Sequence, residues 1–158
     1  MTLYSVLVAD RALQTVDCTG IVEITVRELK KLYPITESTP AQAWHSMDDD
    51  ARILHAPDES AFRQFNIFEW GNPPYDLKYY SEKIYVYGIE GNWGSQFLAD
   101  FLIYLKQHIK PEQNVDIIRF WAGDYDQKLK NFSIKIEEIE MHHLESIQNE
   151  QYIRVALI

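Results

Sequence analysis

Residues 84–121 constrain the fold of this chain more than any other part of the sequence. The stretch begins with a nearly continuous apolar run over 84–89, whose Ile, Tyr and Val residues favour a strand buried on both faces. A turn with two glycines follows, and Ser95 is placed to cap the helix that we predict over 95–110. The stretch therefore predicts a buried strand that leads into a helix.

The predicted helix carries a broad apolar stripe along one side. Residues four positions apart lie on one face of a helix, and here they are Phe97, Phe101, Leu105 and Ile109. Pro111 cannot continue the helix, and residues 115–121 are typical of a second buried strand. We predict a strand–helix–strand unit with a right-handed crossover, in which the stripe packs against a sheet.

Further segments extend this predicted sheet. The runs over 3–9 and 152–158 are apolar, and apolar and polar residues alternate over 132–137 as in a strand with one exposed face. Residues 24–33 have the periodicity of a second helix. Residues 36–80 are predicted to be largely irregular, with short strands or helical turns within 52–55 and 62–70.

Length and composition are those of one domain. The chain has 158 residues, of which 46% are apolar and 13% aromatic, so it can bury a well-packed core. We predict a single α+β domain over 1–158, with a mixed sheet that carries both helices. The apolar runs are too short to span a membrane, and 3–9 lacks the basic leader of a secretion signal, which predicts a cytoplasmic protein.

The net charge of −9 restricts the classes of partner. Nucleic-acid binding requires a basic footprint, and the longest run of Lys and Arg is Lys30-Lys31, so we expect no nucleic-acid partner. An acidic surface also disfavours anionic membranes. The charge suits a basic protein partner, and it equally suits a protein that uses acidity only to remain soluble.

Few residue patterns in the chain point to catalysis. The loop over 88–94 lacks the Lys of a phosphate-binding loop, and adjacent His142 and His143 on a strand would point to opposite faces. We therefore predict no cofactor and no metal. One enzymatic alternative remains, in which Glu90, Asp124 and Asp126 meet beyond the ends of the central strands and hold a divalent cation for phosphoester hydrolysis. The other interpretation of the two aspartates is an ordinary turn.

A protein-binding function uses more of the sequence. Aromatic and carboxylate side chains alternate in the segments predicted to be loops, a composition suited to gripping a basic protein. The candidate partner-binding residues are Trp44, Asp48, Asp49, Asp50, Asp58, Glu59, Glu69, Trp70, Asp76, Tyr79, Tyr80, Trp93, Asp124 and Asp126.

In size, acidity and aromatic content, with Trp-Gly-Asn-Pro over 70–73 and the Trp93-Gly94 step, the chain resembles bacterial immunity proteins. These belong to toxin–immunity systems such as contact-dependent growth inhibition. The resemblance implies a protein that binds a cognate toxin domain, often a nuclease, and blocks its active site or substrate entry. It assigns no role to any single residue and implies no particular fold. A non-catalytic adaptor is the remaining alternative, and the oligomeric state is left open.

Overall fold

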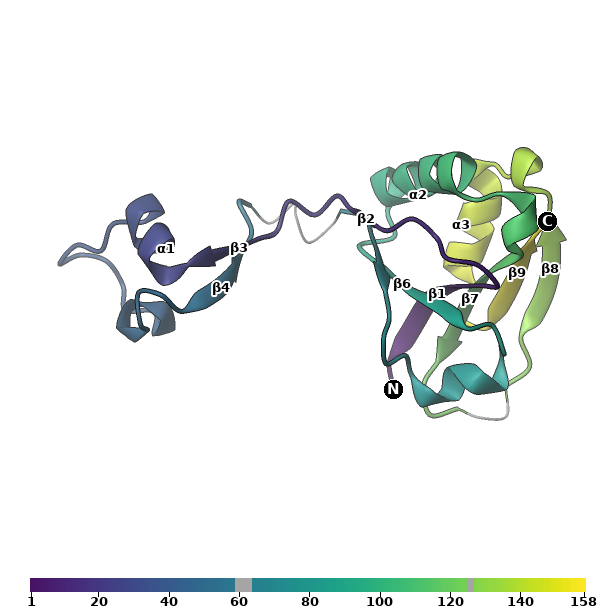
Figure 1. Ribbon diagram of the computed structural model, residues 1–158, viewed down its shortest axis with the longest axis horizontal. Helices are drawn as coiled ribbons and strands as arrows, with labels where there is room; N and C mark the ends of the chain where they lie inside the picture. The colour runs from purple at the N-terminus through teal and green to yellow at the C-terminus, as the bar shows by residue number, and fades with distance from the viewer. Residues whose placement is uncertain (59–63, 125–126) are drawn as a thin grey trace.

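Seven strands form one mixed sheet in a computed structural model that describes residues 1–58, 64–124 and 127–158 (Figure 1). The strands are β1 (Leu3–Ala9), β2 (Val16–Asp17), β5 (Asn66–Glu69), β6 (Tyr85–Glu90), β7 (Val115–Trp121), β8 (Lys130–Ile134) and β9 (Ile153–Leu157). Their order is β2-β5-β6-β1-β7-β9-β8. Neighbours are antiparallel except β8 and β9, which run parallel. The predicted α+β class with a mixed sheet is confirmed.

The first strand lies in the middle of the sheet. Val6 of β1 is opposite Gly88 of β6 on one side and opposite Ile118 of β7 on the other. The predicted strands 84–89 and 115–121 therefore exist and run parallel, but β1 is inserted between them. Residues 6–9 are buried, which fits a strand with neighbours on both sides.

Two helices cover one face of this sheet, α2 (Ser95–His108) and α3 (Met141–Asn149) (Figure 1). The predicted core residues Phe97, Phe101 and Leu105 are fully buried there. Ser95 does not cap the helix as predicted, because Gly94 is the N-cap residue and makes no side-chain capping bond. The helix also ends two residues before the predicted boundary at 110.

Helix α3 was not predicted, and it contains the adjacent His142 and His143, which the sequence analysis considered only for the case of a strand. Both histidines lie in the first turn of α3. Leu144 and Ile147, three residues apart, are its buried contacts with the core. The preceding strand also stops earlier than the predicted 132–137, because β8 ends at Ile134 and gives way to the 3-10 helix η5 (Ile136–Glu138).

The opposite face, called here the helix-free face, has a smaller core. Val6, Val8, Ile118 and Phe120 meet Leu77 of the 3-10 helix η3 (Tyr75–Tyr79). Gly88 on β6 leaves room for the Phe68 ring, which a Cβ atom at this position would overlap. A short 3-10 helix, η4 (Pro111–Gln113), leads into β7.

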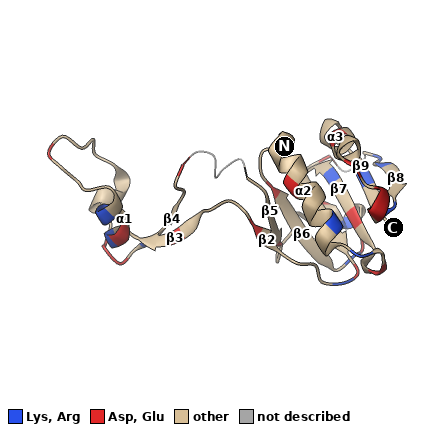
Figure 2. Cartoon of the chain, turned by 90° about the horizontal axis from the view of Figure 1, so that it is seen from above, with Lys and Arg blue, Asp and Glu red and all other residues tan. Residues whose placement is uncertain are grey.

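The second sheet belongs to a separate projection, the arm, which we define as residues 20–57. It contains β3 (Val22–Thr25), α1 (Val26–Leu32), the 3-10 helix η1 (Ala43–Ser46) and β4 (Arg52–His55). Figures 1 and 2 both show the arm extending away from the seven-stranded sheet.

The arm corrects the prediction for residues 24–33. Ile24 and Thr25 pair with β4, and Thr25 forms a capping box with Glu28, so the helix begins at Val26. It packs on β3 through the buried Val26 and Leu29 and does not lie on the large sheet, contrary to the prediction. The predicted short strand at 52–55 is confirmed as β4, and β5 lies within the predicted 62–70.

Candidate functional site

The structure distributes the predicted partner-binding residues over separate places. Those in the arm are Trp44, Asp48, Asp49 and Asp50, and Asp58 is exposed just beyond it. Those on or beside the helix-free face are Trp70, Asp76, Tyr79, Tyr80 and Asp124. Glu69 is exposed on β5, and Trp93 lies between β6 and α2. Glu59 and Asp126 lie outside the described residues.

The acidic run of the arm is engaged with its own helix. Asp49 accepts a hydrogen bond from Lys30 Nζ at 2.6 Å, and Asp50 accepts one from Arg27 Nη2 at 3.0 Å. The bond from Lys30 lowers the pKa of the Asp49 carboxyl. Asp48 accepts from the backbone N–H of Asp50. Figure 2 shows both acidic and basic residues on α1. Through these ion pairs the acidic run holds its loop against α1, and it also adds negative charge to the arm.

Trp44 is partly enclosed by its own loop. Its indole Nε1 donates to Gln42 Oε1 at 2.7 Å, and its ring stands edge-on to the His45 ring with centroids 4.2 Å apart. His45 Nε2 is buried and has no hydrogen-bond partner among the described residues. Trp44 therefore shapes the arm and exposes only part of its surface.

Exposed apolar side chains, by contrast, gather on the arm. Of the thirteen large apolar side chains that are exposed in the described residues, six lie within 20–57. They are Val22, Leu32, Tyr33, Ile35, Met47 and Leu54. The arm also has six carboxylates against four Lys and Arg residues. Apolar and acidic side chains together are the composition predicted for a partner-binding surface. The six exposed apolar residues, however, are not among the partner-binding residues that the sequence analysis named.

Two aspartates of the helix-free face have structural partners. Asp76 is only 7% exposed and accepts the backbone N–H of Gly123 at 2.6 Å, so little of it is accessible for the predicted contact with a partner. The Asp124 carboxylate accepts from the Tyr152 hydroxyl at 2.7 Å. The pKa of Tyr152 is raised to about 12, mainly by burial and secondarily by this hydrogen bond. The Tyr80 hydroxyl donates to the backbone carbonyl of Asp124, which joins η3 to the segment after β7.

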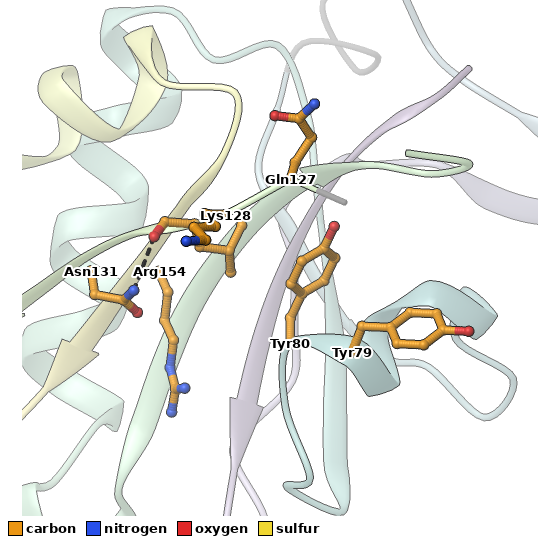
Figure 3. A pocket seen from close by; sticks show the side chains of 7 residues that line it. Tyr79, Tyr80, Gln127, Lys128, Asn131 and Arg154 are labelled. Carbon is orange, nitrogen blue, oxygen red and sulfur yellow. Dashed lines mark hydrogen bonds between the residues drawn. The ribbon is translucent and has the colours of Figure 1, made fainter. Parts of the chain in front are cut away.

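A hollow of about 520 Å³ opens on this face (Figure 3). It is lined by Tyr79, Tyr80, Gln127, Lys128, Leu129, Asn131 and Arg154. Among the described residues, the charged side chains that line it are Lys128 and Arg154, and the exposed Tyr79 ring points away from Arg154. Locally the hollow is basic although the protein is acidic, so it does not fit the expected basic partner.

A buried ion cluster supports the hollow from beneath, and the sequence analysis missed it. Asp116, only 1% exposed, accepts from Lys83 Nζ at 3.0 Å and from Arg154 Nη2 at 2.6 Å. Arg154 Nε also donates to the same carboxylate oxygen at 2.9 Å. The sequence signal that could have revealed this cluster is the single Asp in the otherwise mainly apolar run 115–121. A carboxylate in a buried strand requires cationic or hydrogen-bonding partners.

The Trp93 side chain is not a free surface group. Its ring packs on Phe97 at 4.8 Å between centroids, and the Arg119 guanidinium lies over its face at 4.4 Å. Trp70 is half-buried and meets the Tyr4 ring edge-on. Both tryptophans border a cavity at one end of the sheet, which also contains Glu90.

The hydrolase alternative requires Glu90, Asp124 and Asp126 to converge. Glu90 lines the cavity with Arg119, whereas Asp124 is held by Tyr152 and Gln127 on the helix-free face. Within residues 1–58, 64–124 and 127–158 there is no group of three His, Cys, Asp or Glu side chains that could hold a metal ion. Asp126 lies outside these ranges.

Comparisons with known proteins returned no matching family model, no matching curated protein and no matching solved structure. In the described part of the chain, no helix has the length and apolar character needed to cross a bilayer.

Proposed function

We propose that this protein neutralises a cognate, basic toxin domain by binding it through the arm. The observation that carries the proposal is the gathering of exposed apolar side chains on a projecting, acidic segment. Exposed apolar groups bordered by charge are the usual composition of a protein-binding surface. The resemblance to immunity proteins supports the identity of the partner as a toxin.

The shape of the arm fits inhibition by insertion. Enzyme active sites are concave, and a narrow projection with exposed Leu54 and Tyr33 can enter such a cleft more readily than a flat sheet face. The carboxylates of the arm would then face the cationic groups that a nuclease uses to hold phosphates. Blocking the active site or the substrate entry follows from that placement.

The helix-free face is the less suitable surface for a basic partner. The charged residues that line its hollow in the described part of the chain, Lys128 and Arg154, are both cationic, and although Arg154 is paired with Asp116, neither attracts a basic toxin. The proposal therefore predicts that changes in the arm, and not changes in the hollow, alter toxin binding.

The test uses a toxin domain encoded by the adjacent reading frame, co-expressed with this protein in a growth assay and measured for direct binding. Leu54→Asp places a charge on an arm residue that is 78% exposed, and Ile84→Asp does the same at a residue of the main body that is 80% exposed. Because the exposures match, both variants should fold. We expect Leu54→Asp to abolish protection and to weaken binding about 30-fold or more, as for loss of an interface anchor.

Ile84→Asp should protect as well as the unmodified protein. Equal protection by both variants would reject the arm as the binding surface. Failure of the unmodified protein to bind and protect against that domain would reject toxin neutralisation.

A further inference from the structure

A second cavity, of about 440 Å³, lies at the end of the large sheet where β1 begins and β6 ends. Its lining includes Tyr4, Ser5, Trp70, Glu90, Trp93 and Arg119. It is distinct from the arm, so its function does not depend on toxin binding. The charged lining side chains are one Arg and one Glu.

Arg119 is buried in the cavity wall with part of its guanidinium unused. The residue is 6% exposed, and its Nε donates to Ser5 Oγ at 3.1 Å. Its Nη1 donates to the carbonyl oxygens of Ile147 and Gln148, at 2.8 and 2.6 Å, near the end of α3. Its Nη2 has no acceptor among the described residues, and Arg119 has no carboxylate partner among them either.

The orientation of this guanidinium is fixed before any ligand arrives. Its central carbon lies 4.4 Å from the centre of the Trp93 ring, which covers one face. The Trp93 carbonyl in turn accepts a hydrogen bond from Gln148 of α3. Burial lowers the pKa of Arg119, but a guanidinium remains protonated at neutral pH. A buried cation with free donors and a fixed plane favours a planar oxyanion.

We propose that this cavity binds a small monocarboxylate with an aromatic or apolar body. The carboxylate accepts from Nη2 of Arg119 and from the hydroxyl of Ser5, whose oxygen is already occupied by Arg119 Nε and whose proton is therefore available. Tyr4 and Trp70 belong to the small core of the helix-free face and line the same cavity from that side, where β6 ends and residues 3–5 of β1 are no longer paired with it. Their rings, with centroids 5.4 Å apart, provide an aromatic wall for the body of the ligand.

Glu90 restricts the charge of the ligand. It lines the same cavity, is exposed, and has no ion-pair partner among the described residues. A carboxylate at this position repels anions, and the repulsion on a dianion is about twice that on a monoanion. The site therefore favours a carboxylate over inorganic phosphate.

The test compares phenylacetate with phenylacetamide, its neutral analogue, by titrating the full chain and following the indole N–H signals by NMR. We expect saturable shifts of the Trp70 and Trp93 signals with phenylacetate, while Trp44 in the arm serves as the internal reference. The amide should bind at least 10-fold more weakly, because it cannot form charge-assisted bonds with Arg119.

Two variants test the assigned contacts without removing Arg119, which also binds the end of α3. Ser5→Ala should weaken phenylacetate binding about 10-fold, the effect of one lost hydrogen bond to a charged group. Glu90→Gln should tighten it several-fold and allow inorganic phosphate to compete. Glu69→Gln is the charge-matched control, since Glu69 is exposed on β5 but does not line the cavity.

Equal binding of phenylacetate and phenylacetamide would overturn the proposal, as would the absence of shifts for both probes. It would also be overturned if Glu69→Gln tightened binding as much as Glu90→Gln, because the effect would then reflect overall charge. Retention of full affinity in Ser5→Ala would contradict the proposed position of the carboxylate.

Discussion

Phe101 and Ile103 are two residues apart on α2 and lie in opposite environments. Phe101 is fully buried, with ring contacts to Phe65, Phe97 and Trp93, whereas Ile103 is 52% exposed. At the scale of single residues, this difference in burial decides how much a truncation costs.

We expect Phe101→Ala to lower the free energy of unfolding by about 3–5 kcal/mol, because it removes buried apolar area and leaves a cavity. Ile103→Ala, on the same helix, should change it by no more than about 0.5 kcal/mol. Urea unfolding followed by circular dichroism measures both. A Phe101→Ala protein with unchanged stability would show that α2 is not packed on the sheet as described.

Burial also decides the cost of removing a charge at Asp116, which is almost fully buried and has two cationic partners. We expect Asp116→Asn to cost about 3 kcal/mol, since it leaves Lys83 and Arg154 without their common counter-charge. Glu112→Gln, which neutralises an exposed carboxylate just before the same strand, is the control and should have little effect. Similar midpoints of urea unfolding for the two variants would contradict a structural role of the cluster.

At the scale of elements, the arm and the large sheet are built around different contacts. Helix α1 buries Val26 and Leu29 beside β3, within the arm. The base of the arm is closed by pairing that belongs to the large sheet: Val16 is opposite Ile67, and the Cys18 N–H donates to the Phe65 carbonyl. The sheet core therefore does not require the arm.

Replacing residues 20–57 with a short Gly-Ser linker should leave the large sheet folded. We expect a single cooperative unfolding transition, with stability within about 1 kcal/mol of the full chain, because loop length changes closure entropy only slowly. Near-ultraviolet circular dichroism and urea unfolding measure this result. The shortened protein should also lose protection against the toxin. If it still protects, the arm is not the binding element. If it fails to fold, the large sheet is not structurally independent of the arm.

At the scale of the whole molecule, the net charge of −9 acts on the rate of encounter with a basic partner. Raising the salt concentration from 0.1 M to 1 M shortens the Debye length from about 10 Å to about 3 Å. Association with the toxin domain should therefore slow markedly, whereas dissociation, which depends on desolvated apolar contacts, should change little.

Replacing Asp48, Asp49 and Asp50 with Asn should reproduce the effect of salt on the association rate. The substitutions also release Lys30 and Arg27 from their ion pairs, so the arm itself becomes more positive. Stopped-flow kinetics with the purified toxin domain measures both rates. An association rate that responds neither to salt nor to these substitutions would mean that the acidity serves solubility alone.

The sequence by itself was sufficient for elements whose signal is local. The apolar runs of β1, β6, β7 and β9 and the four-residue repeat of α2 were recognised because burial on a regular element imposes a period or a continuous run. Helix α3 was not predicted because Leu144 and Ile147 are a weak apolar signal among polar neighbours, and short helices gain most of their stability from packing.

Tertiary structure alone decided which distant residues meet. The residues of β1 do not themselves specify that this strand lies between β6 and β7. Likewise, the residues of α1 do not specify that this helix lies in the arm while α3 covers the sheet. Asp116 and Arg119 are both charged residues of one predicted buried strand, but the structure places them differently. Asp116 is the centre of an ion cluster, whereas Arg119 is a hydrogen-bond donor that lines a cavity. The physical reason is that a buried charge is stabilised by partners brought in by other elements, and a local pattern shows the need for partners without showing which they are.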